Sequence, residues 1–265
     1  MDKKKASQYV AKATDSHGNV AYTDDENAIW HELITRQMPI LQNRACKEYM
    51  QGLELLNFHH DKIPQCNEVS AILQKTTGWT LEPVPALIPF DKFFELLANK
   101  KFPAATFIRK REELNYLKEP DIFHEVFGHC PLLTNKAYAD FTYEYGKLGL
   151  SVSHADRVML AKLYWFTIEF GLIKQTEGLR IYGGGILSSM GETPYALDNP
   201  DAKRKPFEPL EVLRTPYRID IMQPVYYVID DFNVLFELMQ MDLIKLIHEA
   251  RTLGMHAPLY ATATA

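Results

Sequence analysis

The segment EPDIFHEVFGHCP holds the first candidates for chemistry, His124 and His129, which stand five residues apart. The zinc-protease motif HExxH instead places its histidines at i and i+4, on one helix face. On a straight α-helix, five residues turn the chain through about 500°, so the two rings would point about 140° apart. Gly128 and Pro131 bracket His129 and predict that the helix ends just before it, which would let His129 turn back toward His124. The spacing disfavours a zinc-protease site and allows a metal site built from a helix end and a second helix.

Glu169 is a candidate for the third ligand. It stands in YWFTIEF among Trp165, Phe166, Ile168 and Phe170, so its carboxylate is expected to be buried. Burying an unpaired carboxylate costs several kcal/mol unless a cation or partner compensates. Two alternatives remain open: the histidines as helix caps or hydrogen-bonded core residues, and Glu169 as the partner of an Arg or Lys. If all three converge, they form a two-histidine, one-carboxylate set, which suits non-haem Fe(II).

The elements that must position these side chains are mainly helices. The clearest helix covers 153–170; it is apolar on most sides and is therefore expected at the centre of the molecule. A helix near 119–128 would carry His124, whereas the consecutive glycines in 181–187 predict a turn or loop. Asp24 or Asp25 is a candidate N-cap for the first helix. Further helices are expected over about 43–56, 67–76, 136–149 and 231–253, with a short strand over 102–108.

Length and composition indicate one mainly α domain. The chain has 265 residues, of which 46% are hydrophobic and 24% charged, as in ordinary globular proteins. Residues 1–25 are expected to form a loose arm, 26–253 a single catalytic domain of many helices with a few short β-strands, and 254–265 a short tail.

Charge and cysteine content exclude several classes of function. A net charge of −5 disfavours non-specific binding to nucleic acid. The three cysteines contain no CxxC pair, so a disulfide framework is not expected. The N-terminal lysines are not followed by an apolar segment, and no window approaches the roughly 18–20 apolar residues of a membrane span. We therefore expect a cytoplasmic protein without membrane partners.

Three motifs carry a resemblance to a known family. HEVFGHCP, LYWFTIEFG and YGGGILSSMGE together resemble the pterin-dependent aromatic amino acid hydroxylases, most closely their single-domain bacterial phenylalanine 4-hydroxylases, and the resemblance spans roughly residues 22–232. It implies the fold of that family, with Fe(II), a tetrahydropterin and O2 as co-substrate. By the family pattern, His124, His129 and Glu169 are the iron ligands. The implied reaction is hydroxylation of L-phenylalanine to L-tyrosine, a step of phenylalanine catabolism.

The resemblance also implies roles for residues around the metal. The residues implied in pterin binding are Val84, Leu87, Ile88, Phe93 and Glu125. Those implied in substrate binding are Arg109, Pro120, Asp121, Trp165, Phe170, Gly185, Ser188 and Ile219. Arg109 would pair with the substrate carboxylate, and Asp121 would orient Arg109 or a ligand histidine. Each has a simpler interpretation: Phe93, Trp165 and Phe170 as core, Arg109 as part of a solvated RKREE run, Asp121 as a helix cap and Ser188 as a turn residue.

Ile219 bears on the choice of substrate. Tyrosine hydroxylases carry an aspartate at the matching position, whereas the apolar Ile219 suits a phenyl ring without a hydroxyl. This favours L-phenylalanine, with L-tryptophan as a possible alternative. No regulatory domain or tetramerisation helix is recognisable, so a monomer is expected. Two functions of other classes remain as alternatives, a zinc hydrolase built on the same histidines and a non-catalytic binding protein.

Overall fold

The computed structural model describes residues 9–115, 117 and 119–260, and these residues are mainly helical. The helices of the first half are α1 (Asp24–Leu41), α2 (Lys47–Leu56), α3 (Cys66–Thr76), α4 (Phe90–Leu97), the 3-10 turn η1 (Arg111–Glu113), the π-helix η2 (Phe123–His129) and α5 (Cys130–Leu133). Those of the second half are α6 (Lys136–Ser151), α7 (His154–Tyr164), the π-helix η3 (Trp165–Glu169), α8 (Gly184–Leu187), α9 (Glu192–Asp198), α10 (Pro209–Arg214), α11 (Asn233–Gln240) and α12 (Leu243–Leu253). The expected mainly α fold class is confirmed.

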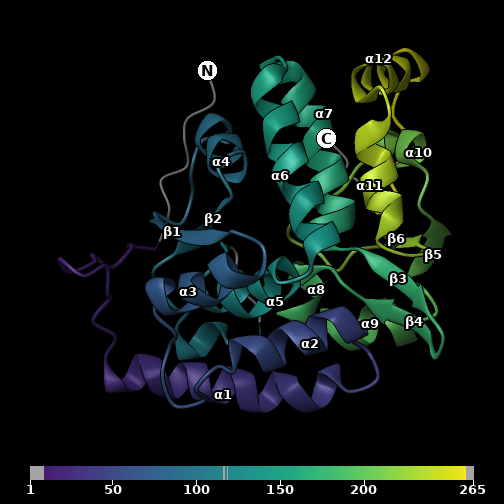
Figure 1. Cartoon of the computed structure of the whole chain (residues 1–265). Coiled ribbons are helices and arrows are strands. Elements are labelled where there is room, and N and C mark those ends of the chain that lie inside the picture. Colours follow the sequence, from purple (N-terminus) through teal and green to yellow (C-terminus); the bar gives the residue numbers. More distant parts are fainter. Residues whose placement is uncertain (1–8, 116, 118, 261–265) are drawn as a thin grey trace, which may run out of the picture.

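Two small sheets flank the helices. Strands β1 (Thr80–Val84) and β2 (Lys101–Ala105) pair in parallel, with Thr80 opposite Lys101. The second sheet has the order β4-β3-β6-β5 and is made of β3 (Leu172–Gln175), β4 (Gly178–Ile181), β5 (Lys203–Pro206) and β6 (Val225–Ile229). Helices α6 and α7 lie between the two sheets, above α1 and α2 (Figure 1). The chain passes from α7 through η3 directly into β3, so Glu169 is held between a central helix and a sheet.

The expected helix over 153–170 lies at the centre of the molecule, but its last turn is not α-helical. Leu160, Leu163 and Ile168 are fully buried, as the apolar pattern predicts. From Trp165 the helix widens into the π-helix η3, which ends at Glu169. Single π turns are rare and frequently occur at functional sites.

The predicted helix end before His129 is wrong. The chain stays helical through Gly128, as the π-helix η2 (Phe123–His129), and continues into α5. Because hydrogen bonds in a π-helix join residues i and i+5, two residues five apart lie about one turn apart on the same face. The unusual histidine spacing is therefore matched by a wider helix rather than by a break.

Three further expectations need correction. The N-cap of α1 is Thr23, which forms a capping box with Glu26, while Asp24 and Asp25 lie in the first turn. The expected long helix over 231–253 is two helices, because the Asp242 side chain accepts a hydrogen bond from Lys245 N at 3.0 Å and starts α12. Residues Gly184–Leu187, expected in a turn, form the short helix α8.

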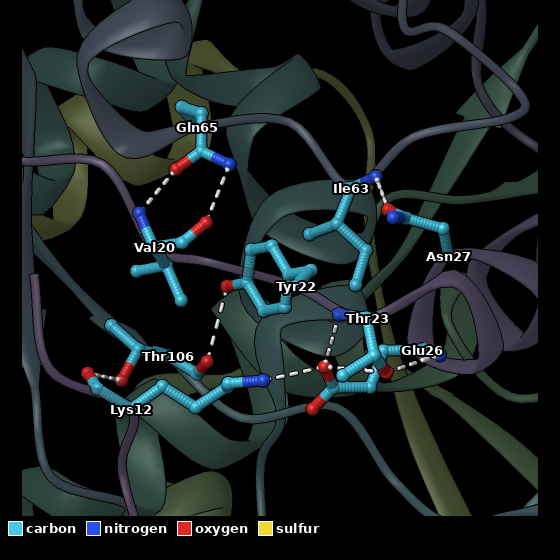
Figure 2. A network of polar contacts seen from close by, with 9 residues as sticks. All are labelled: Lys12, Val20, Tyr22, Thr23, Glu26, Asn27, Ile63, Gln65 and Thr106. Carbon is cyan, nitrogen blue, oxygen red and sulfur yellow. Dashed lines mark hydrogen bonds and ion pairs between the residues drawn. The ribbon is translucent and has the colours of Figure 1, made fainter.

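The described part of the expected loose arm is tied to the body of the protein (Figure 2). Gln65 and Val20 exchange two hydrogen bonds between side chain and backbone, at 2.7 and 3.2 Å. Thr106 donates to the carbonyl of Lys12 at 2.8 Å, and the Tyr22 hydroxyl donates to the carbonyl of Thr106 at 3.1 Å. The segment from Lys12 to Tyr22 therefore supports the chain that follows β2. Residues 1–8 and 261–265, part of the arm and of the expected tail, lie outside the described residues.

The remaining structural findings agree with the composition. Cys46, Cys66 and Cys130 are all buried and free. Among the described residues, no helix is both long enough and apolar enough to cross a bilayer.

Candidate metal centre and aromatic pocket

Two histidines and one glutamate converge where η2 and η3 meet. The Nε2 atoms of His124 and His129 lie 3.0 Å apart, and Glu169 approaches His129 Nε2 at 3.4 Å and His124 Nε2 at 3.6 Å. All three ligand atoms lie within 4.8 Å of one another. Donors held about 2.1 Å from one ion, at right angles, are about 3 Å apart. The spacing therefore fits three ligands on one face of a metal ion, with the opposite face open.

The orientation of His124 is set by the side chain of Ser188. The His124 Nδ1 atom lies 3.0 Å from Ser188 Oγ, and Ser188 in turn donates to the carbonyl of Gly184 at 2.9 Å. Because this contact engages Nδ1, the Nε2 atom of His124 is left to face the other two ligands. The Nδ1 atom of His129 is buried and finds no partner among the described residues.

Three consecutive glycines allow α8 to pack against the ligands. A Cβ on Gly184 would lie 2.4 Å from His129 Nδ1, and one on Gly183 would lie 2.4 Å from the carbonyl oxygen of Glu169. A Cβ on Gly185 would come within 3.0 Å of the Glu169 carboxylate. Glycine is thus required by close approach of the backbone rather than by a turn. The three consecutive glycines are evident in the sequence, but there they predicted a turn or loop.

Burial and charge prepare His124 and Glu169 to bind a cation. Burial lowers the pKa of His124 to about 4, which keeps its imidazole neutral near pH 7. Burial by itself would raise the pKa of Glu169, but the two histidines outweigh it and the pKa is lowered. Imidazole nitrogens and an ionised carboxylate form the donor set that a divalent transition metal accepts. The residues present therefore fit a bound iron ion.

Arg109 is buried, contrary to what its charge run would suggest. It is 5% exposed and forms a bidentate pair with Asp121, at 2.8 and 2.9 Å. Asp121 also accepts hydrogen bonds from the backbone N of Arg109 and from that of His124, at 2.9 and 3.0 Å. Asp121 therefore connects the guanidinium of Arg109 to the start of η2, the helix that carries His124. Burial would raise the pKa of Asp121, but the charge of Arg109 outweighs burial and lowers it.

Trp165, Phe170 and Gly185, three of the residues expected to bind the substrate, lie together on and around η3. Trp165 packs against Phe170, with ring centroids 4.5 Å apart, and stacks on Tyr217 at the same distance. Pro120 is half-buried and leads into Asp121, while Gly185 lies against Glu169. Ile219 differs from these residues because it is 68% exposed, on the loop before β6.

The residues expected to bind the pterin lie at the end of β1, in the loop that follows it, on α4 and in η2. Val84 is buried at the end of β1, whereas Leu87 is 52% exposed in the loop that follows and Ile88 is half-buried. Phe93 is half-buried on α4 and meets the Tyr164 ring edge-on at 5.2 Å. Glu125 is buried next to His124, and burial raises the pKa of its carboxyl well above the ordinary value.

Several residues of this region were not predicted from the sequence. Tyr217, Gln223 and Glu192 surround Trp165 and the loop that carries Ile219. Nothing in their local sequence separates them from ordinary polar or aromatic residues, because their contacts join segments far apart in the chain. For Gly183 and Gly184, the only indication in the sequence was that they stand in a run of glycines.

Comparisons with known proteins agree with this geometry. Residues 2–249 match the family of biopterin-dependent aromatic amino acid hydroxylases. The chain is 57% identical over 256 residues to a phenylalanine-4-hydroxylase of Pseudomonas aeruginosa, a match covering 97% of each chain. It also resembles the apo structure of a cold-active phenylalanine hydroxylase from Colwellia psychrerythraea, at TM-score 0.92 and 56% identity, covering 94% of this chain and 97% of that one.

A third relative carries a metal. The Chromobacterium violaceum phenylalanine hydroxylase with bound oxidised Fe(III) has a TM-score of 0.87 and 41% identity, covering 92% of this chain and 91% of that one. The family match extends over nearly the whole chain, including the three candidate ligands and the packed rings of Trp165 and Phe170. The chain therefore belongs to the biopterin-dependent aromatic amino acid hydroxylases.

Proposed function

We propose that this protein hydroxylates L-phenylalanine to L-tyrosine, with Fe(II) held by His124, His129 and Glu169. The convergence of these three side chains within 4.8 Å carries the proposal. Its relatives in Pseudomonas aeruginosa and Vibrio cholerae, at 57% and 53% identity, are phenylalanine-4-hydroxylases and support the choice of substrate. When bound, iron and tetrahydropterin supply O2 activation and two electrons; one oxygen atom goes to the substrate ring and the other to the pterin.

The protein's own contribution is to hold and orient its substrates. Arg109 would receive the substrate carboxylate, and its bidentate bond to Asp121 fixes the guanidinium before substrate arrives. Trp165 and Phe170 would enclose the aromatic ring beside Glu169. Both rings would also exclude water from the metal site.

On the pterin side, two residues have the right chemistry. The half-buried ring of Phe93 would provide a stacking surface for the pterin ring. Burial raises the pKa of Glu125 well above its ordinary value and so favours the protonated carboxyl, which can donate as well as accept a hydrogen bond at a pterin nitrogen. The loop of Val84, Leu87 and Ile88 would close over the edge of that ring.

The test is turnover with the metal controlled. Chelator-stripped protein receives Fe(II), tetrahydrobiopterin, O2 and L-phenylalanine, and L-tyrosine is measured; a parallel sample receives Zn(II). Tyrosine formed only with Fe(II) and pterin is expected and would exclude both the zinc hydrolase and the non-catalytic binding protein. Folded, iron-loaded protein that forms no tyrosine would reject the proposal, and L-tryptophan would be the next substrate to try.

The ligand assignment has its own test. Glu169→Gln should weaken Fe(II) binding at least about 100-fold, because it removes the only anionic donor of the three, while the fold persists. Calorimetric metal titration and circular dichroism measure the two properties separately. A Glu169→Gln variant that binds iron and forms tyrosine like the wild type would show that Glu169 is not a ligand. Monomeric state and cytoplasmic location stay predictions, and sedimentation analysis tests the first.

A further inference from the structure

A buried amide joins the aromatic pocket to the loop that carries Ile219. Gln223 is 1% exposed, and its Oε1 accepts a hydrogen bond from the indole Nε1 of Trp165 at 3.0 Å. Its Nε2 donates to the carbonyl oxygens of Arg218 and Ile221, both at 2.9 Å. One side chain thus uses its acceptor and both of its donors to connect the pocket wall with the loop.

The position of Gln223 is imposed from outside the loop. Glu192, 6% exposed on α9, accepts a hydrogen bond from the backbone N of Gln223 at 2.8 Å and another from the Tyr226 hydroxyl on β6. A buried carboxyl that satisfies two donors holds the chain at this point. The backbone of Gln223 is therefore fixed by α9, and its side chain in turn holds the loop.

The loop between its anchors has few constraints of its own. Ile219 and Met222 are 68% and 46% exposed, and Arg218 pairs with Asp220 inside the loop. At the other end, Tyr217 stacks on the Trp165 ring at 4.5 Å. Trp165 is thus contacted from both ends of the loop, by a ring at the start and by an amide at the end. Loss of the amide would free the end that follows Ile219.

We propose that Gln223 is a positioning residue for substrate selection. It fixes the loop of Tyr217 and Ile219 relative to Trp165, so that the ring site beside Trp165 admits a phenyl ring and disfavours a larger indole. The inference rests on the proposed function, in which Trp165 forms a wall of the ring pocket. A hydrophobic pocket distinguishes two apolar rings only by their size, so the positions of its side chains decide which ring fits.

The test compares two amino acid substrates. Gln223→Met preserves side-chain length and removes all three hydrogen bonds. We expect the KM for L-phenylalanine to rise about tenfold, kcat to stay within about threefold, and the ratio of kcat/KM for L-tryptophan over L-phenylalanine to rise about tenfold. Gln175→Met is the matched control, because Gln175 bonds Lys47 N and Glu48 on the β3 side of the molecule. The ratio of kcat/KM for L-tryptophan over L-phenylalanine in Gln175→Met should equal that of the wild type.

A double-mutant cycle tests whether Gln223 acts through Trp165. Trp165→Phe removes the indole donor while keeping an aromatic wall, so in that background Gln223→Met should change the substrate ratio by less than about twofold. If Gln223→Met does not fold, Trp165→Phe alone must raise the ratio.

Two results would overturn the proposal. One is an unchanged substrate ratio in Gln223→Met despite a lower melting temperature, which indicates a purely structural role. The other is full additivity in the cycle. Failure of the proposed function would have a different result, because the wild-type protein itself would then form no tyrosine. The wild-type assay is made separately from those of the variants.

Discussion

The metal centre and the loop 215–223 are held by opposite means. At the centre, each ligand side chain lies on a π-helix, and α8 packs against two of the ligands so closely that a Cβ on Gly184 would overlap His129. Ile219, Asp220 and Met222 in the middle of the loop are exposed, and the loop is fixed mainly at its ends, by Gln223 and by the stack of Tyr217 on Trp165. Ligand geometry is thus set by rigid backbone contact, while the wall that selects the ring is set by a few polar bonds.

This difference has a functional meaning. Metal binding needs donors placed to within a few tenths of an ångström, which dense backbone packing provides. Substrate selection needs a wall that can admit and release a ring, which a loop with fixed ends provides. Changes at the centre should therefore weaken metal binding or stability, and changes at the loop should alter substrate binding and preference rather than metal binding.

The largest expected effect at the centre comes from Asp121→Asn. Removing the carboxylate leaves the buried guanidinium of Arg109 without its partner, so the free energy of unfolding should fall by about 3–5 kcal/mol. Urea unfolding of the metal-free protein measures this, with Arg111→Gln as the control because Arg111 is exposed in the same charge run. Equal effects of the two substitutions would show that the buried pair of Arg109 and Asp121 stabilises the protein no more than the exposed pairs of Arg111 do.

Gly184→Ala should come next. The new Cβ would displace the His129 ring, because it would lie 2.4 Å from Nδ1. We expect Fe(II) affinity to fall about 100-fold, measured by calorimetric titration. Gly191→Ala is the control, since its Cβ would meet only the end of the Met222 side chain, at 3.0 Å. Wild-type affinity in Gly184→Ala would contradict the role given to close packing.

Ser188→Ala should have a smaller effect on the same site. It removes the contact to His124 Nδ1 but leaves the three ligands in place. Fe(II) affinity should fall about tenfold, the lower end of what loss of such an outer contact costs. Ser189→Ala serves as the control, because Ser189 Oγ accepts only from the backbone of Glu192. An unchanged affinity in Ser188→Ala would show that packing alone orients His124.

The smallest effect is expected beside the loop, at Glu192. Burial raises the pKa of Glu192 above 4.5, although its hydrogen bonds from Gln223 and Tyr226 oppose this. A carboxyl with a raised pKa contributes stability below pH 4.5 that is lost as the pH rises through the folded-state value. Glu192→Gln keeps an acceptor and cannot ionise, so its free energy of unfolding relative to wild type should increase by about 1 kcal/mol from pH 5 to pH 8. Urea titrations at the two pH values measure it, and a relative decrease would contradict the assignment.

The sequence by itself determined the fold class, the central helix and the three candidate ligands. Each depends on local information: apolar residues on most sides of 153–170 require a buried helix, and a glutamate inside that helix requires a compensating partner. The motifs around His124, His129 and Glu169 were long enough to identify the family, which the comparisons confirm.

Only the tertiary structure decided how these residues meet. The histidine spacing excluded a straight α-helix, but the energy difference between a break and a π turn depends on what packs against it, here α8 with its glycines. The burial of Arg109, two residues before the exposed Arg111, depends on Asp121 twelve residues away. Gln223 and Glu192 carry no local signal at all, because their hydrogen bonds connect α9, β6 and η3, which only folding brings together.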